Sequence, residues 1–136
     1  MTEIAVPNEQ SMLELGASLV RAFSVGDIVL FEGELGAGKT TMIRGMLDAL
    51  GWTEPVRSPT YNLFAVYPTD PPVLHADFYR IANTAGTGFE DYLESHLCLV
   101  EWPKAMLDFV DFDTAKRVVI LFEGDGRRVQ LSNISI

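Results

Sequence analysis

An eight-residue, glycine-rich motif constrains the fold of this chain more than any other feature of its sequence. Residues 33–40 read Gly-Glu-Leu-Gly-Ala-Gly-Lys-Thr and match the pattern G-x-x-x-x-G-K-[ST] without a mismatch. With ordinary glycine usage, such a match arises by chance in on the order of one in a few hundred chains of this length. The motif therefore predicts a phosphate-binding loop between a buried strand and a helix.

The residues on both sides of the motif have the expected pattern. Residues 28–31 are wholly apolar, which is typical of a strand buried on both faces of a parallel sheet. From Lys39 onward, apolar residues return at helical spacing, and Gly51 stands where a C-terminal cap belongs. In this unit Lys39 would reach the β- and γ-phosphates of a nucleotide, and Thr40 would place its hydroxyl on Mg²⁺.

The other segments predict an α/β fold of the P-loop NTPase type. An amphipathic helix from Met12 to Phe23 follows a capping box at Ser11 and Glu14. Strands are expected at residues 62–67, 73–76, 97–100, 117–122 and 129–134, with a short helix at 88–96. We expect a mixed, largely parallel β-sheet flanked by helices, with a C-terminal β-hairpin. The pattern does not specify the strand order.

Composition limits the class of protein. The chain has 136 residues, 48% of them hydrophobic, so we expect one domain over residues 1–136. Its single cysteine cannot form an internal disulfide, and neither a basic leader nor a membrane-spanning apolar run is visible, so a cytoplasmic protein is expected. The net charge of −9 opposes unaided binding to nucleic acid.

Two acidic residues and one loop are candidates for the rest of a phosphoryl-transfer site. Asp77 and Glu101 each follow an expected buried strand, so either could stand at the carboxyl edge of the sheet as a Mg²⁺ ligand, and the sequence does not rank them. Thr60, after Ser58 and Pro59, could sense the γ-phosphate or Mg²⁺ in a switch loop. Ordinary turn composition explains that tripeptide equally well.

The remaining polar and aromatic residues have weaker signals. Trp102 and Cys98 are expected to serve packing. His75 and His96 lack metal-ligand spacing, so neither is assigned chemistry. The candidate phosphate partners are Arg57, Arg80, Arg127 and Arg128.

Three classes of phosphate-loop protein compete. A regulatory GTPase should carry an N-K-x-D motif, which this chain lacks. A small-molecule kinase, which would transfer the γ-phosphate of ATP to a hydroxyl acceptor, needs an acceptor pocket and usually a lid, and the segments after Asp77 are short for that. A partner-dependent ATPase suits a minimal domain best, with the kinase as the alternative.

Four motifs in order resemble the TsaE (YjeE) family, the bacterial ATPase subunits of threonylcarbamoyladenosine synthesis in tRNA. They are the loop at residues 33–41, Ser-Pro-Thr-Tyr at 58–61, Asp-Phe-Tyr-Arg at 77–80 and Leu-Val-Glu-Trp-Pro at 99–103. The resemblance implies slow, Mg²⁺-dependent hydrolysis of ATP in support of the transferase made of TsaD and TsaB. A separate enzyme supplies the threonylcarbamoyl group, and tRNA is then held mainly by the partners.

The resemblance also implies roles for individual residues. Lys39 grips phosphates, Thr40 and Glu101 bind Mg²⁺, and Asp77 is needed for hydrolysis. Thr60 gains a switch-loop role and Trp102 a position beside the nucleotide. The other nucleotide-binding residues implied are Glu34, Leu35, Gly36, Ala37, Gly38 and Thr41 in the loop, with Glu9 and Gly126 near the adenine.

Overall fold

The computed structural model describes residues 1–56, 59 and 62–135, which form a seven-stranded sheet and two α-helices. The strands are β1 (Thr2–Val6), β2 (Ile28–Glu32), β3 (Phe64–Tyr67), β4 (Val73–Asp77), β5 (Leu97–Glu101), β6 (Lys116–Glu123) and β7 (Gly126–Ser132). The helices are α1 (Glu9–Leu19) and α2 (Lys39–Ala49), with short 3₁₀ helices η1 (Val20–Ala22), η2 (Phe89–Tyr92) and η3 (Pro103–Met106).

The sheet has the order β1-β7-β6-β2-β5-β4-β3. Its four central strands, β6, β2, β5 and β4, run parallel, whereas β7 and β1 at one edge and β3 at the other pair antiparallel. This arrangement confirms the expected mixed α/β fold with a C-terminal hairpin. It also places β2, which leads into the glycine-rich motif, at the centre of the sheet.

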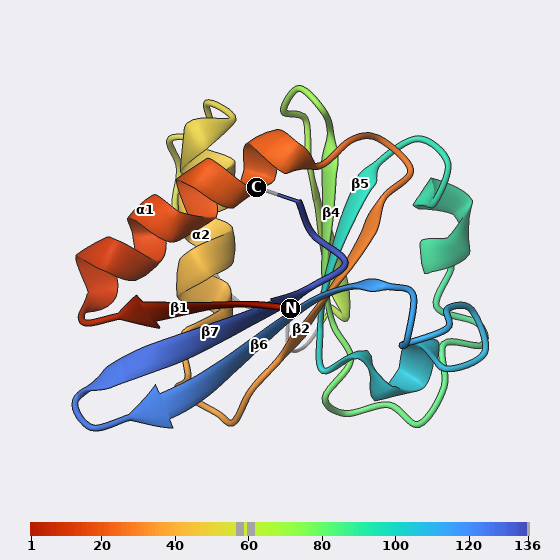
Figure 1. The fold of residues 1–136 in the computed structure, drawn as a ribbon. Helices are drawn as coiled ribbons and strands as arrows, with labels where there is room; N and C mark the ends of the chain where they lie inside the picture. The colour runs from red at the N-terminus through yellow and green to blue at the C-terminus, as the bar shows by residue number, and fades with distance from the viewer. Residues whose placement is uncertain (57–58, 60–61, 136) are drawn as a thin grey trace.

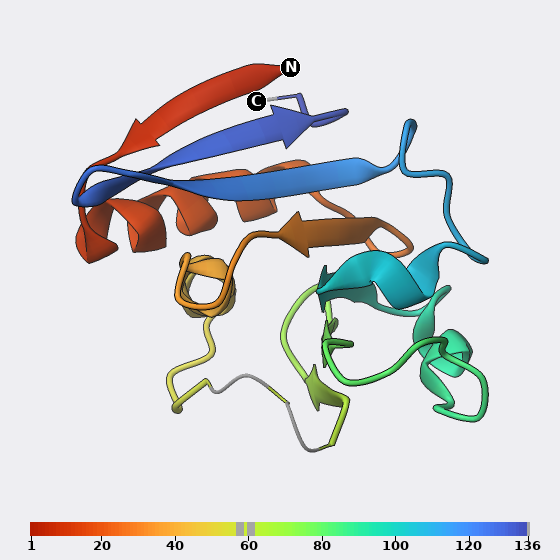
Figure 2. The same ribbon diagram turned by 90° about the horizontal axis from the view of Figure 1, so that it is seen from below.

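The two faces of the sheet are covered differently. Because side chains alternate along a strand, Val29 and Phe31 of β2 join a core with α2, while Leu30 joins a second core with Phe78 and Phe89. Figure 1 shows α1 and α2 together on one side of the sheet and the short helices η2 and η3 on the other, and Figure 2 gives the same view from below. Both α-helices therefore cover the same face of the sheet, and α2, the helix that follows the motif, is one of them.

The α1 and α2 helices touch through their backbones at two glycines. A Cβ atom on Gly16 would lie 2.2 Å from the carbonyl oxygen of Met42, and one on Gly45 would lie 2.2 Å from that of Leu13. Neither distance leaves room for a methyl group. The glycines thus fix how closely α1 lies against the helix that follows the phosphate loop.

Some expectations need correction. The N-cap of α1 is Asn8, whose side chain accepts from the backbone N–H of Ser11 at 2.9 Å, so the capping box expected at Ser11 and Glu14 is wrong. The helix expected at residues 88–96 shrinks to the single 3₁₀ turn of η2. Strand β1 was not expected at all; it is an edge strand with only Val6 fully buried, so its apolar pattern is weak.

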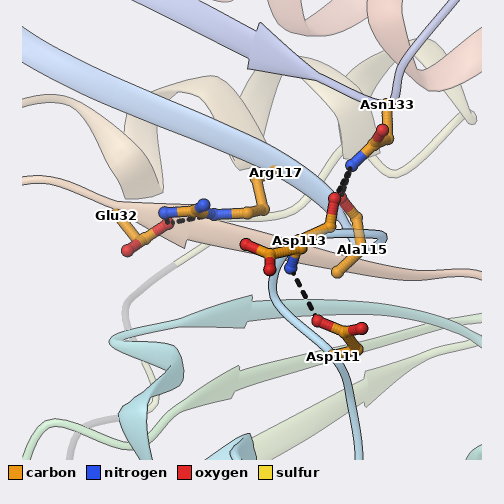
Figure 3. A network of polar contacts seen from close by, with 6 residues as sticks. All are labelled: Glu32, Asp111, Asp113, Ala115, Arg117 and Asn133. Carbon is orange, nitrogen blue, oxygen red and sulfur yellow. Dashed lines mark hydrogen bonds and ion pairs between the residues drawn. The ribbon is translucent and has the colours of Figure 1, made fainter.

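The connection into β6 is held by polar contacts shown in Figure 3. The side chain of Asn133 donates to the carbonyl oxygens of Asp113, at 3.0 Å, and Ala115, at 2.8 Å. Arg117 forms an ion pair with Glu32 at 2.7 Å, which links β6 to the end of β2. No helix within the described residues is both long and apolar enough to span a bilayer.

Candidate functional site

The glycine-rich motif forms a tight loop between β2 and α2, as its spacing predicts. Gly38, the N-cap of α2, has a φ of 116°, a conformation that L side chains rarely adopt. A Cβ on Gly33 would lie 2.8 Å from the carbonyl oxygen of Ile120, so this position needs glycine for a close approach. The first N–H groups of α2 have no partner within the helix, and such a helix N-terminus beside a glycine-rich loop suits an anion.

A cavity of about 420 Å³ opens over this loop. Most of the residues expected around phosphates line it, although they come from three separate parts of the chain. They are Leu35, Gly36, Ala37, Gly38, Lys39, Thr40, Thr41, Asp77, Tyr79, Arg80, Glu101 and Trp102. Glu34 is not among them: it is exposed and lines a larger, mainly apolar cavity of about 1060 Å³, which shares Tyr79 and Trp102 with the first one.

The two candidate acids lie side by side in the lining of the cavity. Asp77 and Glu101 end the neighbouring parallel strands β4 and β5 and are paired in register, and both are buried. Thr40 Oγ1 donates to Glu101 Oε2 at 2.9 Å, which joins the start of α2 to the sheet edge. Asp77 Oδ1 accepts from the backbone N–H of Tyr79 at 3.0 Å.

This donor set fits Mg²⁺. A threonine hydroxyl beside one or two carboxylates is a common protein contribution to a Mg²⁺ site, where phosphates and water supply the other ligands. The described residues contain no group of three or more His, Cys, Asp or Glu side chains that could hold a metal ion alone.

His75 is a site residue that sequence reasoning missed. Its ring is fully buried on β4, and Nε2 lies 2.6 Å from Glu101 Oε2. Within the described residues, Nδ1 has no hydrogen-bond partner. With Glu101 as a carboxylate, Nε2 is the donor in this contact, a tautomer assigned from the hydrogen bond itself. The only available signal was its position two residues before Asp77 on the same strand face.

Lys39 lies between the loop and an aromatic ring. Its side chain is 5% exposed, and Nζ donates to the carbonyl oxygens of Gly33 and, at 3.1 Å, Glu34. Nζ also lies 4.0 Å from the centre of the Trp102 ring. Burial lowers the pKa of Lys39, and the charges of Glu101 and Asp77 oppose that shift.

Trp102 lines the cavity over the loop instead of serving packing alone. It follows β5 with a left-handed φ of 54°, which turns the chain at the edge of the sheet. Its ring contacts Tyr79, with centroids 4.7 Å apart. Cys98, by contrast, is fully buried within β5, as expected for a packing residue.

Glu9 and Gly126 lie around a second, smaller cavity of about 220 Å³ on the other side of the loop. This cavity shares Gly36, Ala37, Gly38 and Thr41 with the first one. The Glu9 carboxylate is exposed and pairs with Arg44 at 2.6 Å. The structure therefore brings both residues next to the loop, and their contact with a base stays a prediction.

The candidate arginines separate into different places. Arg80 lines the cavity over the loop, whereas Arg128 forms an ion pair with Glu123 at 2.9 Å on the hairpin. Arg127 contacts the outer side of the loop. Arg57 and Thr60 lie outside the described residues.

Comparison with known proteins gives one consistent result. The family model described as threonylcarbamoyl adenosine biosynthesis protein TsaE matches residues 6–129. Proteins named tRNA threonylcarbamoyladenosine biosynthesis protein TsaE are similar to this chain over most of its length. The one from a Nostoc species is 35% identical over 114 residues, covering 78% of this chain and 70% of the relative. The one from Streptomyces coelicolor is 34% identical over 122 residues, covering 84% of this chain and 82% of the relative.

A solved structure agrees with these relatives. The crystal structure of YdiB from Bacillus subtilis superposes with a TM-score of 0.79 at 28% identity, covering 98% of this chain and 86% of that one.

Proposed function

Since the chain belongs to the TsaE family of threonylcarbamoyl adenosine biosynthesis proteins, we propose that it binds ATP with Mg²⁺ and hydrolyses it slowly. In this role it is an accessory subunit for the transferase formed by TsaD and TsaB, which makes N6-threonylcarbamoyladenosine next to the anticodon of tRNA. The chain itself does not transfer the threonylcarbamoyl group.

One observation carries the proposal: the loop's lysine, the Thr40 hydroxyl and two strand-end carboxylates converge on one cavity. A phosphate chain in that cavity would be met by loop amides and by Lys39, which would exchange its two loop carbonyls for phosphate oxygens. Thr40 and Glu101 would hold Mg²⁺, which neutralises charge on the phosphates. Asp77, beside Glu101, would orient the attacking water or complete the metal site.

Binding can be tested by titration calorimetry with ADP and ATP, with and without Mg²⁺. Lys39→Ala should abolish turnover and weaken nucleotide binding by at least about tenfold, because a charge-assisted contact to phosphate is lost. Lys116→Ala is the matched control, since this lysine pairs with Asp27 at 3.8 Å and lines no cavity described above. Absence of nucleotide binding by the unaltered protein would refute the proposal.

A second experiment separates an accessory ATPase from a small-molecule kinase. The ATPase rate is measured alone, with a TsaB–TsaD pair, and with a panel of small hydroxyl compounds. Stimulation by the protein pair is the expected result, whereas stimulation by a metabolite with formation of a phosphorylated product would favour the kinase.

The acidic composition gives an independent expectation about RNA. With a net charge of −9, the isolated chain should show no appreciable affinity for tRNA at physiological salt, because phosphate neutralisation by Lys and Arg supplies most of such affinity. Filter binding of labelled tRNA to the chain alone and to its complex with TsaB and TsaD tests this. Tight binding by the chain alone would contradict it.

A further inference from the structure

A guanidinium group from the C-terminal hairpin is bound to the outer side of the phosphate loop. Arg127, on β7, donates from Nε to the carbonyl oxygen of Ala37 at 3.0 Å and from Nη2 to that of Gly36 at 3.2 Å. Its Nη1 donates to the carbonyl oxygen of Gly126 at 2.8 Å. One side chain thus ties two successive peptide groups of the loop to the hairpin.

Strand geometry and an aromatic contact hold Arg127 in this position. In β7 it lies on the same face as Val129, which belongs to the core on the helix side of the sheet. It is paired in register with Phe122 of β6, and its guanidinium lies 4.3 Å from the centre of that ring. Arg128 points to the opposite face and pairs with Glu123.

The contact controls where loop N–H groups point. The Ala37 carbonyl and the Gly38 N–H belong to one peptide unit, in which they point in opposite directions. Holding this carbonyl on the outside therefore directs the Gly38 N–H toward the phosphate side. In the preceding unit, the Ala37 N–H closes the loop by donating to the Glu34 carbonyl oxygen at 3.0 Å. The positive charge of Arg127 also offsets the partial charge of both bound carbonyls.

We propose that Arg127 is a positioning residue that pre-organises the phosphate loop from outside, an inference that rests on nucleotide binding as the proposed function. It acts through the loop backbone and does not itself need to touch phosphate. Pre-organisation of this kind increases affinity because the loop does not have to be ordered when the ligand binds. The role depends on a residue far outside the glycine-rich motif.

The test uses titration calorimetry with two probes, ADP and inorganic pyrophosphate, both without metal. Arg127→Gln should raise the dissociation constant for both probes by about tenfold, as expected when hydrogen bonds from a charged group are lost. Arg128→Gln is the matched control, being the next residue on the opposite face, and should stay within about twofold of the unaltered protein. Equal affinities for the Arg127 and Arg128 variants would overturn the proposal.

Pyrophosphate separates action through the loop from direct contact with a base. Arg127 also lines the smaller cavity, so a loss for ADP without a loss for pyrophosphate would place its effect on the nucleoside and overturn the proposal. Failure of the unaltered protein to bind ADP or ATP, with and without Mg²⁺, would refute the proposed function and this inference together, whereas binding that is insensitive to Arg127→Gln refutes this inference alone.

Further variants guard against misfolding. Arg127→Lys keeps the charge but loses the two-pronged geometry, and Phe122→Leu removes the aromatic support while leaving every donor in place. Both variants should weaken pyrophosphate binding by a smaller factor than Arg127→Gln does. Their midpoints of urea unfolding should equal that of Arg128→Gln. If Arg127→Gln does not fold, affinities of both variants equal to that of the unaltered protein would overturn the proposal.

Discussion

The buried ring of His75 contacts the carboxylate of Glu101 across neighbouring strands, with 2.6 Å between Nε2 and Oε2. Thr40 donates to the same oxygen at 2.9 Å, so two groups fix the orientation of this carboxylate. If Glu101 binds Mg²⁺ as proposed, the other oxygen, Oε1, is the one left for the metal ion. A residue in the position of His75, which would orient a ligand without contacting the metal, often affects metal affinity strongly.

His75→Ala should separate metal-dependent from metal-independent binding. We expect the Mg²⁺-dependent gain in ADP affinity to fall by about tenfold, while ADP affinity without Mg²⁺ changes by less than about twofold. The free energy of unfolding should fall by about 1–3 kcal/mol, because a buried acceptor loses its donor. Calorimetry with and without Mg²⁺ and urea unfolding measure these effects.

His75→Gln supplies the control, since its amide can still donate to Glu101. Partial recovery of the Mg²⁺ effect is expected in this variant. An equal loss of ADP affinity with and without Mg²⁺ in His75→Ala would mean that His75 supports the loop or the fold instead of the metal ligand.

The contact between Lys39 and Trp102 predicts an optical signal for binding. Lys39 Nζ lies 4.0 Å from the Trp102 ring centre and would have to move to reach phosphates. Adding ADP should therefore change the fluorescence of Trp102. The chain has two tryptophans, and the other, Trp52, contacts Tyr67 at 5.0 Å and lines neither cavity at the loop. A change that persists in Trp102→Phe and disappears in Trp52→Phe would contradict this prediction.

The close contact between α1 and α2 predicts a large cost for one added methyl group. Gly16→Ala would place Cβ 2.2 Å from the Met42 carbonyl oxygen and should lower the free energy of unfolding by about 1–3 kcal/mol. Alanine is favoured over glycine in a helix by about 1 kcal/mol, so a net loss shows that the steric term is larger. Ser18→Ala, at an exposed position of α1, should change stability by less than about 0.5 kcal/mol in the same urea titration.

Local spacing predicted the parts of the site that are close in sequence, and chain order predicted part of the rest. The loop, its strand and its helix follow from one short motif and its flanking apolar residues. Asp77 and Glu101 were recognised because each ends a buried apolar run. The contact of His75 with Glu101 could not be predicted, because it requires β4 and β5 to be neighbours and the pattern left the strand order open.

The same limit applies to Arg127. Its side chain reaches the loop only because β7 lies next to β6 and β6 next to β2, an arrangement set by tertiary packing. Sequence reasoning identified it as a possible phosphate partner from its charge, but the structure shows it bound to loop carbonyls.

Burial of Cys98 predicts a loss of stability at high pH. Desolvation raises the pKa of this thiol from 9.0 to about 11 in the folded protein. As the pH rises past about 9, the unfolded chain loses this proton first, which stabilises the unfolded state. The contribution of the Cys98 thiol to the free energy of unfolding is therefore fully present below about pH 9. It decreases by about 2 kcal/mol as the pH approaches 11.

Urea unfolding at pH 8 and pH 10.5, with Cys98→Ala as the control, measures this effect. The variant removes the only cysteine, so its stability should fall less between the two pH values than that of the unaltered protein.

A thiol reagent gives a second readout, because at pH 8 only about 0.1% of a thiol with this pKa is ionised. Labelling should therefore require unfolding. Reaction of the folded protein as fast as that of the urea-unfolded chain would show that the thiol is accessible and its pKa is not raised.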